Sequence, residues 1–202
     1  MEVITLLFEA PLQSWGDESL FENRKTTSYP TKSAITGLIC AANGAERGGD
    51  KEKEIISILN NCKTEIYVME QGEILEDYHT VDTNEKNNLV TRRYYIMDGK
   101  FGCTIEGKNL TKIETGLANP KWGGWLGRRC CIPSERIYRG KFKNKEEALK
   151  ELGDVKLRII EDENGTVTKD VAVDFEKRIF SSRKIIVEKI MKNELKIENE
   201  TK

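Results

Sequence analysis

The residues best suited to chemistry are Pro30-Thr31-Lys32-Ser33, which stand directly before an apolar helical stretch at 34–42. Pro30 keeps the chain extended, and Thr31 or Ser33 can cap the first turn of the helix. The free N–H groups at such a helix start carry the positive end of the helix dipole, and Lys32 adds a charge that we expect on the exposed side. The pattern predicts a phosphate contact, although an ordinary capped core helix would carry the same residue types.

A nucleotide-binding P-loop is excluded at this position. That loop needs glycines before its Lys-Ser pair so that the backbone can wrap around phosphates, and here Tyr29-Pro30-Thr31 precede Lys32. The contact that we expect is therefore one without a glycine cradle, as in a protein that grips a nucleic-acid backbone.

A basic stretch at 120–140 is a second place where a polyanion could bind. The whole chain has 33 Lys and Arg against 34 Asp and Glu, a formal net charge of −1, so any nucleic-acid site must be local. Within the stretch, basic residues alternate with aromatic residues that could stack on bases: Lys121, Arg128, Arg129, Arg136 and Arg139 with Trp122, Trp125 and Tyr138. The two tryptophans fit equally well as core anchors.

Five cysteines and one histidine, His79, limit the other chemistry. No Cys-x-x-Cys pair occurs, so we predict no zinc site, no other metal and no cofactor. The odd cysteine count, with no signal peptide and no apolar run of membrane length, predicts a reducing cytoplasm and no membrane. His79 is the one side chain suited to carry protons near neutral pH, and no lysine adjoins it.

The elements that must position these residues predict an α+β fold. Residues 3–8 form a continuous apolar run that is typical of a central strand. Helices are predicted at 34–42, ended by Gly44, and at 51–59, and a strand at 64–69 follows.

The chain then makes a polar excursion whose tip is predicted at 84–88, and it returns as a strand from Arg92. A Thr111/Glu114 capping box opens a helix at 111–117, and a strand near 130–132 follows. This order of elements predicts a ferredoxin-like (RRM-like) domain over 1–140, although the usual RNP aromatic motif is absent.

Residues 141–202 form an extension that we expect to pack on this core. A charged helix at 145–152 ends at Gly153, and Asn164-Gly165 predicts a β-hairpin between strands at 155–160 and 166–173. The last dozen residues are predicted to be a frayed helix or a tail.

An ordered set of motifs over residues 1–187 resembles the CasD family of CRISPR-associated Cascade subunits, in its subtype I-E-like branch of the RAMP superfamily. The motifs are Pro11-Leu12-Gln13-Ser14-Trp15-Gly16 with Phe21 and Arg24, Pro30-Thr31-Lys32-Ser33 with Gly37, Asp77-Tyr78-His79-Thr80, Arg93-Tyr94-Tyr95, Leu126-Gly127-Arg128-Arg129 with Cys131, and Asp174-Phe175 with Arg178 and Arg183.

This resemblance implies a non-catalytic RNA-binding subunit that holds the 5′ handle of the crRNA in a Cascade complex for antiviral defence. It implies the backbone and large subunits of Cascade as partners, with target DNA bound through the complex. A thumb at about 79–93 would kink the guide beside the spacer. The expected RNA-binding residues are Gln13, Ser14, Trp15, Arg24, Lys32, Ser33, His79, Arg92, Arg93, Arg128, Arg129, Arg178 and Arg183.

Two details of the returning strand depend on this resemblance. Local chemistry at Asp98-Gly99 favours a two-residue hairpin turn, whereas the family implies one long strand from 92 to 105, and we expect the long strand. Arg92 and Arg93 must point to opposite faces of that strand, so only one of them can face the RNA. The Arg-x-Tyr motif favours Arg93.

Two other functions stay open. Relatives in another CRISPR subtype cut precursor RNA without a metal, so a metal-independent endoribonuclease with His79 as its acid–base group is the alternative. An α+β interaction module that binds no nucleic acid is the third possibility. Cleavage of repeat RNA that is lost on changing His79 would favour the endoribonuclease, whereas salt-dependent binding without cleavage would favour the RNA-binding subunit.

Overall fold

A six-stranded antiparallel sheet forms the centre of the molecule. The structure is a computed structural model that describes residues 1–16, 22–81 and 89–190. The strands are β1 (Glu2–Glu9), β4 (Lys63–Glu70), β7 (Lys100–Gly107), β8 (Tyr138–Phe142), β9 (Leu157–Asp174) and β10 (Ile179–Lys189), in the order β10-β9-β4-β7-β1-β8. The strands predicted at 3–8 and 64–69 are therefore confirmed as β1 and β4, which both pair with β7.

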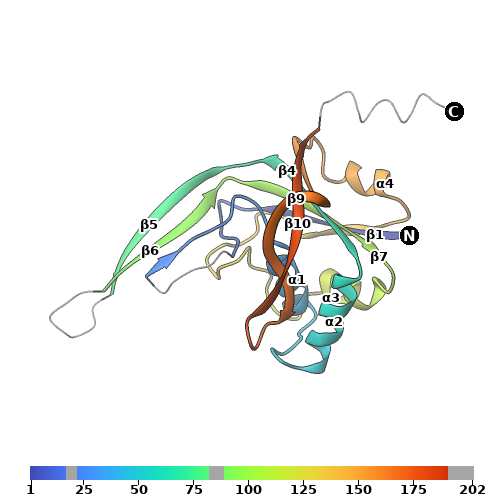
Figure 1. Cartoon of the computed structure of the whole chain (residues 1–202), viewed down its shortest axis with the longest axis horizontal. Helices are drawn as coiled ribbons and strands as arrows, with labels where there is room; N and C mark the ends of the chain where they lie inside the picture. The colour runs from blue at the N-terminus through green and yellow to red at the C-terminus, as the bar shows by residue number, and fades with distance from the viewer. Residues whose placement is uncertain (17–21, 82–88, 191–202) are drawn as a thin grey trace.

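Helices cover both faces of this sheet (Figure 1). On one face lie α1 (Lys32–Ala42), α2 (Asp50–Asn60) and α3 (Thr111–Ala118), and on the other lies the short α4 (Lys145–Lys150). Strand β1 packs against the helices on both faces of the sheet because its side chains alternate. Ile4, Leu6 and Phe8 belong to the core under α1, whereas Leu7 belongs to a smaller hydrophobic cluster beside α4. All four helices of the described residues were predicted, with bounds that differ by a few residues.

The ends of α1 follow from local chemistry. The Thr31 hydroxyl accepts a hydrogen bond from the backbone N–H of Ala34, as predicted for an N-cap, and Gly44 takes a positive φ of 63° just after the helix. The capping box predicted for α3 is wrong, because the residue at the N-cap position is Leu110. The Thr111 hydroxyl instead accepts a hydrogen bond from Lys141.

A second sheet carries a long hairpin. Strand β5 (Glu73–Val81) pairs antiparallel with β6 (Leu89–Met97), and two short strands, β2 (Leu12–Gln13) and β3 (Asn23–Arg24), also pair with β6. Figure 1 shows this hairpin as a two-stranded arm that extends away from the helices. We call β5 and β6 the arm; the polar tip predicted at 84–88 lies outside the described residues.

The long strand expected from 92 to 105 is wrong, because the chain breaks between β6 and β7 at Asp98-Gly99. Asp98 has a φ of 51°, and its N–H donates to the carbonyl of Pro11. The hairpin alternative is not seen either: β6 pairs with β5, whereas β7 pairs with β4 and β1. A matching break occurs between the neighbouring strands β4 and β5, where Gly72 has a φ of 70°. The two breaks together let the arm leave the plane of the main sheet.

Two further strand predictions are wrong. Residues 130–132 form a tight loop, closed by hydrogen bonds from Cys131 to Arg128 and from Leu126 to Cys131. Asn164-Gly165 is not a turn but lies inside β9, at a shift in its register with β10. A Cβ on Gly165 would lie 2.3 Å from the carbonyl oxygen of Ile185, so the glycine allows close strand contact rather than chain reversal. The real turn follows Asp174.

The architecture is mixed α+β with a mostly antiparallel sheet. Within the described part of the chain, the search for a helix of sufficient length and apolarity to cross a membrane found none. The predicted C-terminal tail, residues 191–202, lies outside the described residues.

Candidate nucleic-acid interface

A groove of about 560 Å³ lies along one side of α1, and we call it the α1 groove. Four other segments complete its lining: the loop that holds β3, the stretch from the end of α1 into α2, the loop before β8, and the turn between β9 and β10 with the first residues of β10. Residues that line it include Ser14, Arg24, Lys25, Ser33, Gly37, Arg47, Glu52, Trp122, Trp125, Arg128, Phe175 and Phe180. Tertiary folding therefore brings together segments that are far apart in the sequence.

The charge of the α1 groove is positive although the chain as a whole is nearly neutral. Among the described residues that line it, four are basic, Arg24, Lys25, Arg47 and Arg128, and one is acidic, Glu52. The Glu52 carboxylate is buried and accepts a hydrogen bond from the backbone N–H of Gly48. Its negative charge is therefore partly compensated by a donor within the protein. Such a surface attracts a polyanion locally.

Arg128 is held in place at the edge of this groove. Its guanidinium lies 4.5 Å from the centre of the Tyr95 ring, and its Nη2 donates a hydrogen bond of 2.8 Å to the carbonyl of Arg24. Its Nη1 is buried without a hydrogen-bond partner. Arg129 is exposed instead. Of the two neighbouring arginines, therefore, Arg128 has a fixed geometry with donor capacity left over.

Gly127 allows a close approach between two loops of the protein itself. Its φ is 98°, and a Cβ there would lie 1.6 Å from the carbonyl oxygen of Ser14. The Ser14 N–H also donates to the carbonyl of Leu126. This contact between two loops fixes Ser14 and Arg128 relative to each other along the groove.

Two residues of the Gln13-Ser14-Trp15 motif, which were expected to contact RNA, are buried and have hydrogen-bond partners within the protein. Gln13 and Trp15 are 0% and 1% exposed. Gln13 donates to the carbonyl of Gly99 at 2.5 Å and accepts from the Trp15 indole at 3.1 Å, and the Trp15 ring packs edge-on against Phe8. The motif fixes the junction of β2 with the arm, and Ser14 is its member that lines the α1 groove.

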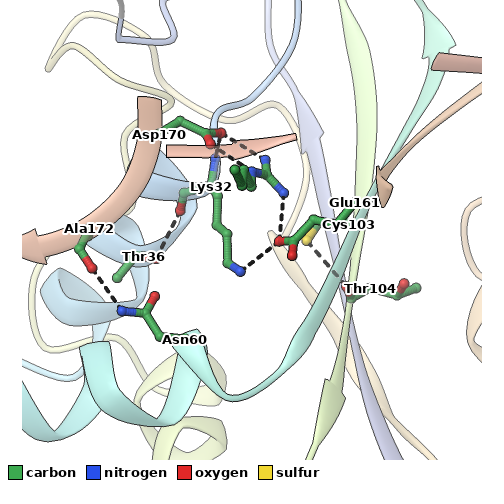
Figure 2. Close-up of polar contacts among 9 residues, drawn as sticks. Lys32, Thr36, Asn60, Cys103, Thr104, Glu161, Asp170 and Ala172 are labelled. Carbon is green, nitrogen blue, oxygen red and sulfur yellow. Dashed lines mark hydrogen bonds and ion pairs between the residues drawn. The ribbon is translucent and has the colours of Figure 1, made fainter. Parts of the chain in front are cut away.

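Lys32 is also buried, at 5% exposure, so the expectation that its charge lies on the exposed side is wrong. Figure 2 shows its ammonium pointing to Glu161, with an Nζ–Oε1 distance of 2.9 Å, and the Asp170 carboxylate next to its backbone. The Lys32 N–H donates to Asp170 Oδ2 at 2.9 Å. The start of α1 does bind an anion, as its dipole favours, but that anion is a side chain of β9.

Arg183, also expected to contact RNA, completes this arrangement. Its guanidinium binds both oxygens of Asp170, at 2.7 and 2.8 Å, and reaches Glu161 at 3.1 Å. We call Lys32, Glu161, Asp170 and Arg183 the ion-pair cluster. Burial alone would raise the pKa of Glu161, but hydrogen bonds and charges from Lys32 and Arg183 outweigh it and lower the pKa below its ordinary value. The cluster attaches α1 to the β9–β10 ribbon.

Arg92 and Arg93 lie on strand β6 of the arm. The cross-strand register pairs Arg92 with Tyr78 and Arg93 with Asp77, so the two arginines point to opposite faces, as predicted. Arg92 forms an exposed ion pair with Glu76, with 3.5 Å between the charged atoms. Arg93 is half-buried, and its Nε is buried without a partner.

His79 and Arg178 are separate from the groove. The His79 ring contacts the Asp77 carboxylate on β5, and Arg178 is exposed in the turn between β9 and β10, with a φ of 55°. Neither of them lines the α1 groove. Within the described residues, no group of three or more His, Cys, Asp or Glu side chains is placed to hold a metal ion.

Sequence reasoning missed several groove residues. Lys25 and Arg47 stand in segments without a motif, and only the fold brings them to α1. Phe175 was part of a family motif, but nothing in its neighbourhood indicated a contact with α1. Trp122 and Trp125 are 40% and 41% exposed, which favours their predicted availability for stacking over a role as core anchors.

Comparison with known proteins gives a consistent result. A sequence model of the CRISPR-associated protein family (Cas_Cas5) matches residues 3–186. The curated protein "CRISPR system Cascade subunit CasD" of Escherichia coli (strain K12) is 22% identical over 156 residues, which cover 68% of this chain and 70% of that protein.

Solved structures agree over nearly the full length. A chain described as "CRISPR RNA-guided surveillance complex" has a TM-score of 0.76 and 26% identity, over 93% of this chain and 89% of its own. Another, "Crystal structure of Cas protein", has a TM-score of 0.74 and 29% identity, over 95% and 96%.

Proposed function

Because this chain belongs to the CRISPR-associated protein family (Cas_Cas5), we propose that it is a guide-RNA-binding subunit of a Cascade surveillance complex. In this role it holds the 5′ handle of the crRNA in the α1 groove and performs no catalysis. The CasD relative and the structural neighbour from an RNA-guided surveillance complex support this assignment.

The observation that carries the proposal is the composition of the α1 groove. Four basic side chains, two exposed tryptophans and two phenylalanines line one groove in a chain of net charge −1. Cations that hold phosphates beside aromatic rings that stack on bases are the features of a site for single-stranded nucleic acid. The chemistry that we expected at the start of α1 thus belongs to the groove beside it.

The core is best described as ferredoxin-like. Its chain order is β1, α1, β4, β7, α3, β8, with α2 inserted after α1, and the antiparallel strands lie in the order β8-β1-β7-β4. A βαββαβ unit with its last strand beside the first supports this description. We extend the proposal to the domains: 1–140 bind RNA, 141–202 pack on the core, and the arm is the thumb that contacts the guide beside the spacer.

The partners follow from the same assignment. The protein assembles in the cytoplasm with the backbone and large subunits of Cascade and meets target DNA through the complex. Isolation of the tagged chain from its host, followed by sequencing of the 5′ ends of bound RNA, tests this directly. Recovery of crRNA with a uniform handle is expected, and random cellular RNA would contradict the proposal.

Binding of purified protein to a synthetic handle RNA tests the function of the groove. Affinity for single strands falls with salt by about 0.7 log unit per log unit for each phosphate contact, so four cations predict a slope of about −3. A slope near zero would favour an interaction module that binds no nucleic acid.

The same preparation tests for cleavage, with precursor RNA as the substrate and His79→Ala as the comparison. We expect binding without cleavage for both proteins. Cleavage that disappears in His79→Ala would support the endoribonuclease instead.

A further inference from the structure

Gly37 lies in the middle of α1, where glycine makes a helix less stable than alanine does. Such a glycine usually has a packing reason. Gly116 in α3 has one, because a Cβ there would lie 2.4 Å from the side-chain Cγ of Asn43. At Gly37 the single atom of the described residues within 4 Å of an added Cβ is the tip of the Phe175 ring, at 3.6 Å, which is an ordinary van der Waals contact. The folded protein therefore has room for alanine at this position.

The space over Gly37 belongs to the α1 groove. Most other α1 residues that line it, Ser33, Ala34, Cys40 and Ala41, are also small, and Leu38 is the one larger side chain among them. Phe175, in the turn directly after β9, lies against this part of the helix and packs edge-on with Phe180, at 6.1 Å between ring centres. A flat floor of helix backbone thus lies beside an aromatic ring that is fixed by its neighbour.

Phosphate-binding groups lie in the same groove but on other segments. Arg128 is fixed over Tyr95 with Nη1 unpaired, and Arg24 lies beside it, because its carbonyl accepts from Arg128. Trp122 and Trp125 add two exposed rings from the loop before β8. The groove volume, about 560 Å³, is within the range of sites that enclose a small organic ligand.

We propose that one unpaired nucleobase of the bound RNA leaves the strand and lies on the α1 backbone at Gly37, against the ring of Phe175. Glycine stands here because the base, rather than any part of the protein, needs the space that a side chain would fill. Ring stacking accepts the face of every base, so the ligand is an unpaired base as a chemical class. The inference rests on the proposed function, since it assumes that RNA enters the groove.

A series of substitutions at Gly37 tests the inference in the full-length protein. Gly37→Ala and Gly37→Leu should both raise the melting temperature, because each improves helix propensity. Affinity for handle RNA should fall in the order glycine, alanine, leucine, by on the order of tenfold for leucine, as stacking of one base predicts. Ser57→Leu, at an exposed position of α2 outside the groove, is the matched control and should bind as the wild type does.

Synthetic handle RNAs in which single nucleotides are made abasic identify the base. In the wild type, removing the base at one position should reduce affinity by a factor similar to that of the Gly37→Leu substitution. In Gly37→Leu, removing the same base should reduce affinity no further, because the leucine side chain already excludes that base. If Gly37→Leu folds poorly, Gly37→Ala still gives the comparison.

The outcomes separate the two claims. A wild-type protein that binds no handle RNA contradicts both the proposed function and this inference. A wild type that binds, but with equal affinity for every abasic RNA or with no loss in the Gly37 variants, overturns the inference and leaves the RNA-binding function in place.

Discussion

The four side chains of the ion-pair cluster have a role in stability that single substitutions can separate from RNA binding. Lys32→Ala removes the ammonium that lies 2.9 Å from Glu161. We expect a loss of about 1–2 kcal/mol in the free energy of unfolding, because Glu161 loses a partner but stays partly accessible to water. Urea denaturation measures this change.

The control for that substitution is Lys53→Ala in α2, where an exposed pair with Asp50 has 3.8 Å between its charged atoms. This change should cost less than about 0.5 kcal/mol. Handle affinity of folded Lys32→Ala should equal that of the wild type. If affinity fell while stability stayed the same, Lys32 would be an RNA ligand after all.

Arg128 and Arg129 are adjacent in the sequence, but their different surroundings predict different effects on binding. Arg128 stacks over Tyr95 and donates to the Arg24 carbonyl, whereas Arg129 is exposed. Lysine keeps the charge but lacks the planar fork, so Arg128→Lys should lower the preference for handle RNA over scrambled RNA several-fold. Arg129→Lys should change it little. Competition at fixed salt measures both, and equal effects would mean that the loop supplies only general charge.

At the scale of elements, the arm separates Arg92 from Arg93. Arg93 lies on the same face of β6 as Tyr95, on which Arg128 stacks, and we call this the inner face of the arm. Arg92 lies on the opposite, outer face and pairs with Glu76. Arg93→Ala should therefore weaken retention of RNA in the assembled complex more than Arg92→Ala does. The measurement is the crRNA recovered per complex. A larger loss for Arg92→Ala would place the RNA on the outer face.

The contact between α4 and β4 predicts how stability depends on acid. Burial tends to raise the pKa of Glu65, but hydrogen bonds from Lys145, Tyr67 and Lys63 outweigh it and lower the pKa to about 2. Because the folded pKa lies below the ordinary value of 4.5, this stabilisation is complete above pH 4.5 and is lost as the pH falls toward 2.

Glu65→Gln removes that titration, so its stability should fall less steeply with acid over this range. Unfolding midpoints at a series of pH values test the expectation. The control is Glu70→Gln, on the same strand as Glu65, which removes an exposed ion pair between Glu70 and Lys156. This variant should keep the wild-type dependence of stability on pH. If the stability of Glu65→Gln fell with acid as steeply as that of the wild type, other carboxylates would dominate acid unfolding.

At the scale of the whole molecule, the C-terminal extension is part of the core and not an independent unit. β9 pairs with β4, Ile159 and Ile185 are buried in the core beneath the helices, and Asn60 of α2 donates to the carbonyl of Ala172. A chain that ends at Gly153 should therefore lose cooperative thermal unfolding. A sharp transition in that truncated protein would show that residues 1–153 fold alone.

Local sequence determined the elements whose interactions join near neighbours. The Thr31 cap acts on Ala34, the apolar run makes β1, and Gly44 follows the end of α1, so α1, β1, β4 and the helix order were predictable. The basic and aromatic composition of 120–140 also located part of the α1 groove, and the motif order indicated the family. For the elements and the basic stretch, the information lies within a few residues or in composition, whereas the family was indicated by the order of motifs along the chain.

The tertiary structure decided which of these residues are free to act. Lys32 is separated by 129 residues from Glu161 and by 138 from Asp170, and no local pattern shows that the fold will join them. The same is true of Asn164-Gly165, where pairing with β10 overrides a strong local turn signal. Burial and partner choice are set by contacts between distant segments, so the sequence could identify the anion site at α1 but not that Asp170 occupies it.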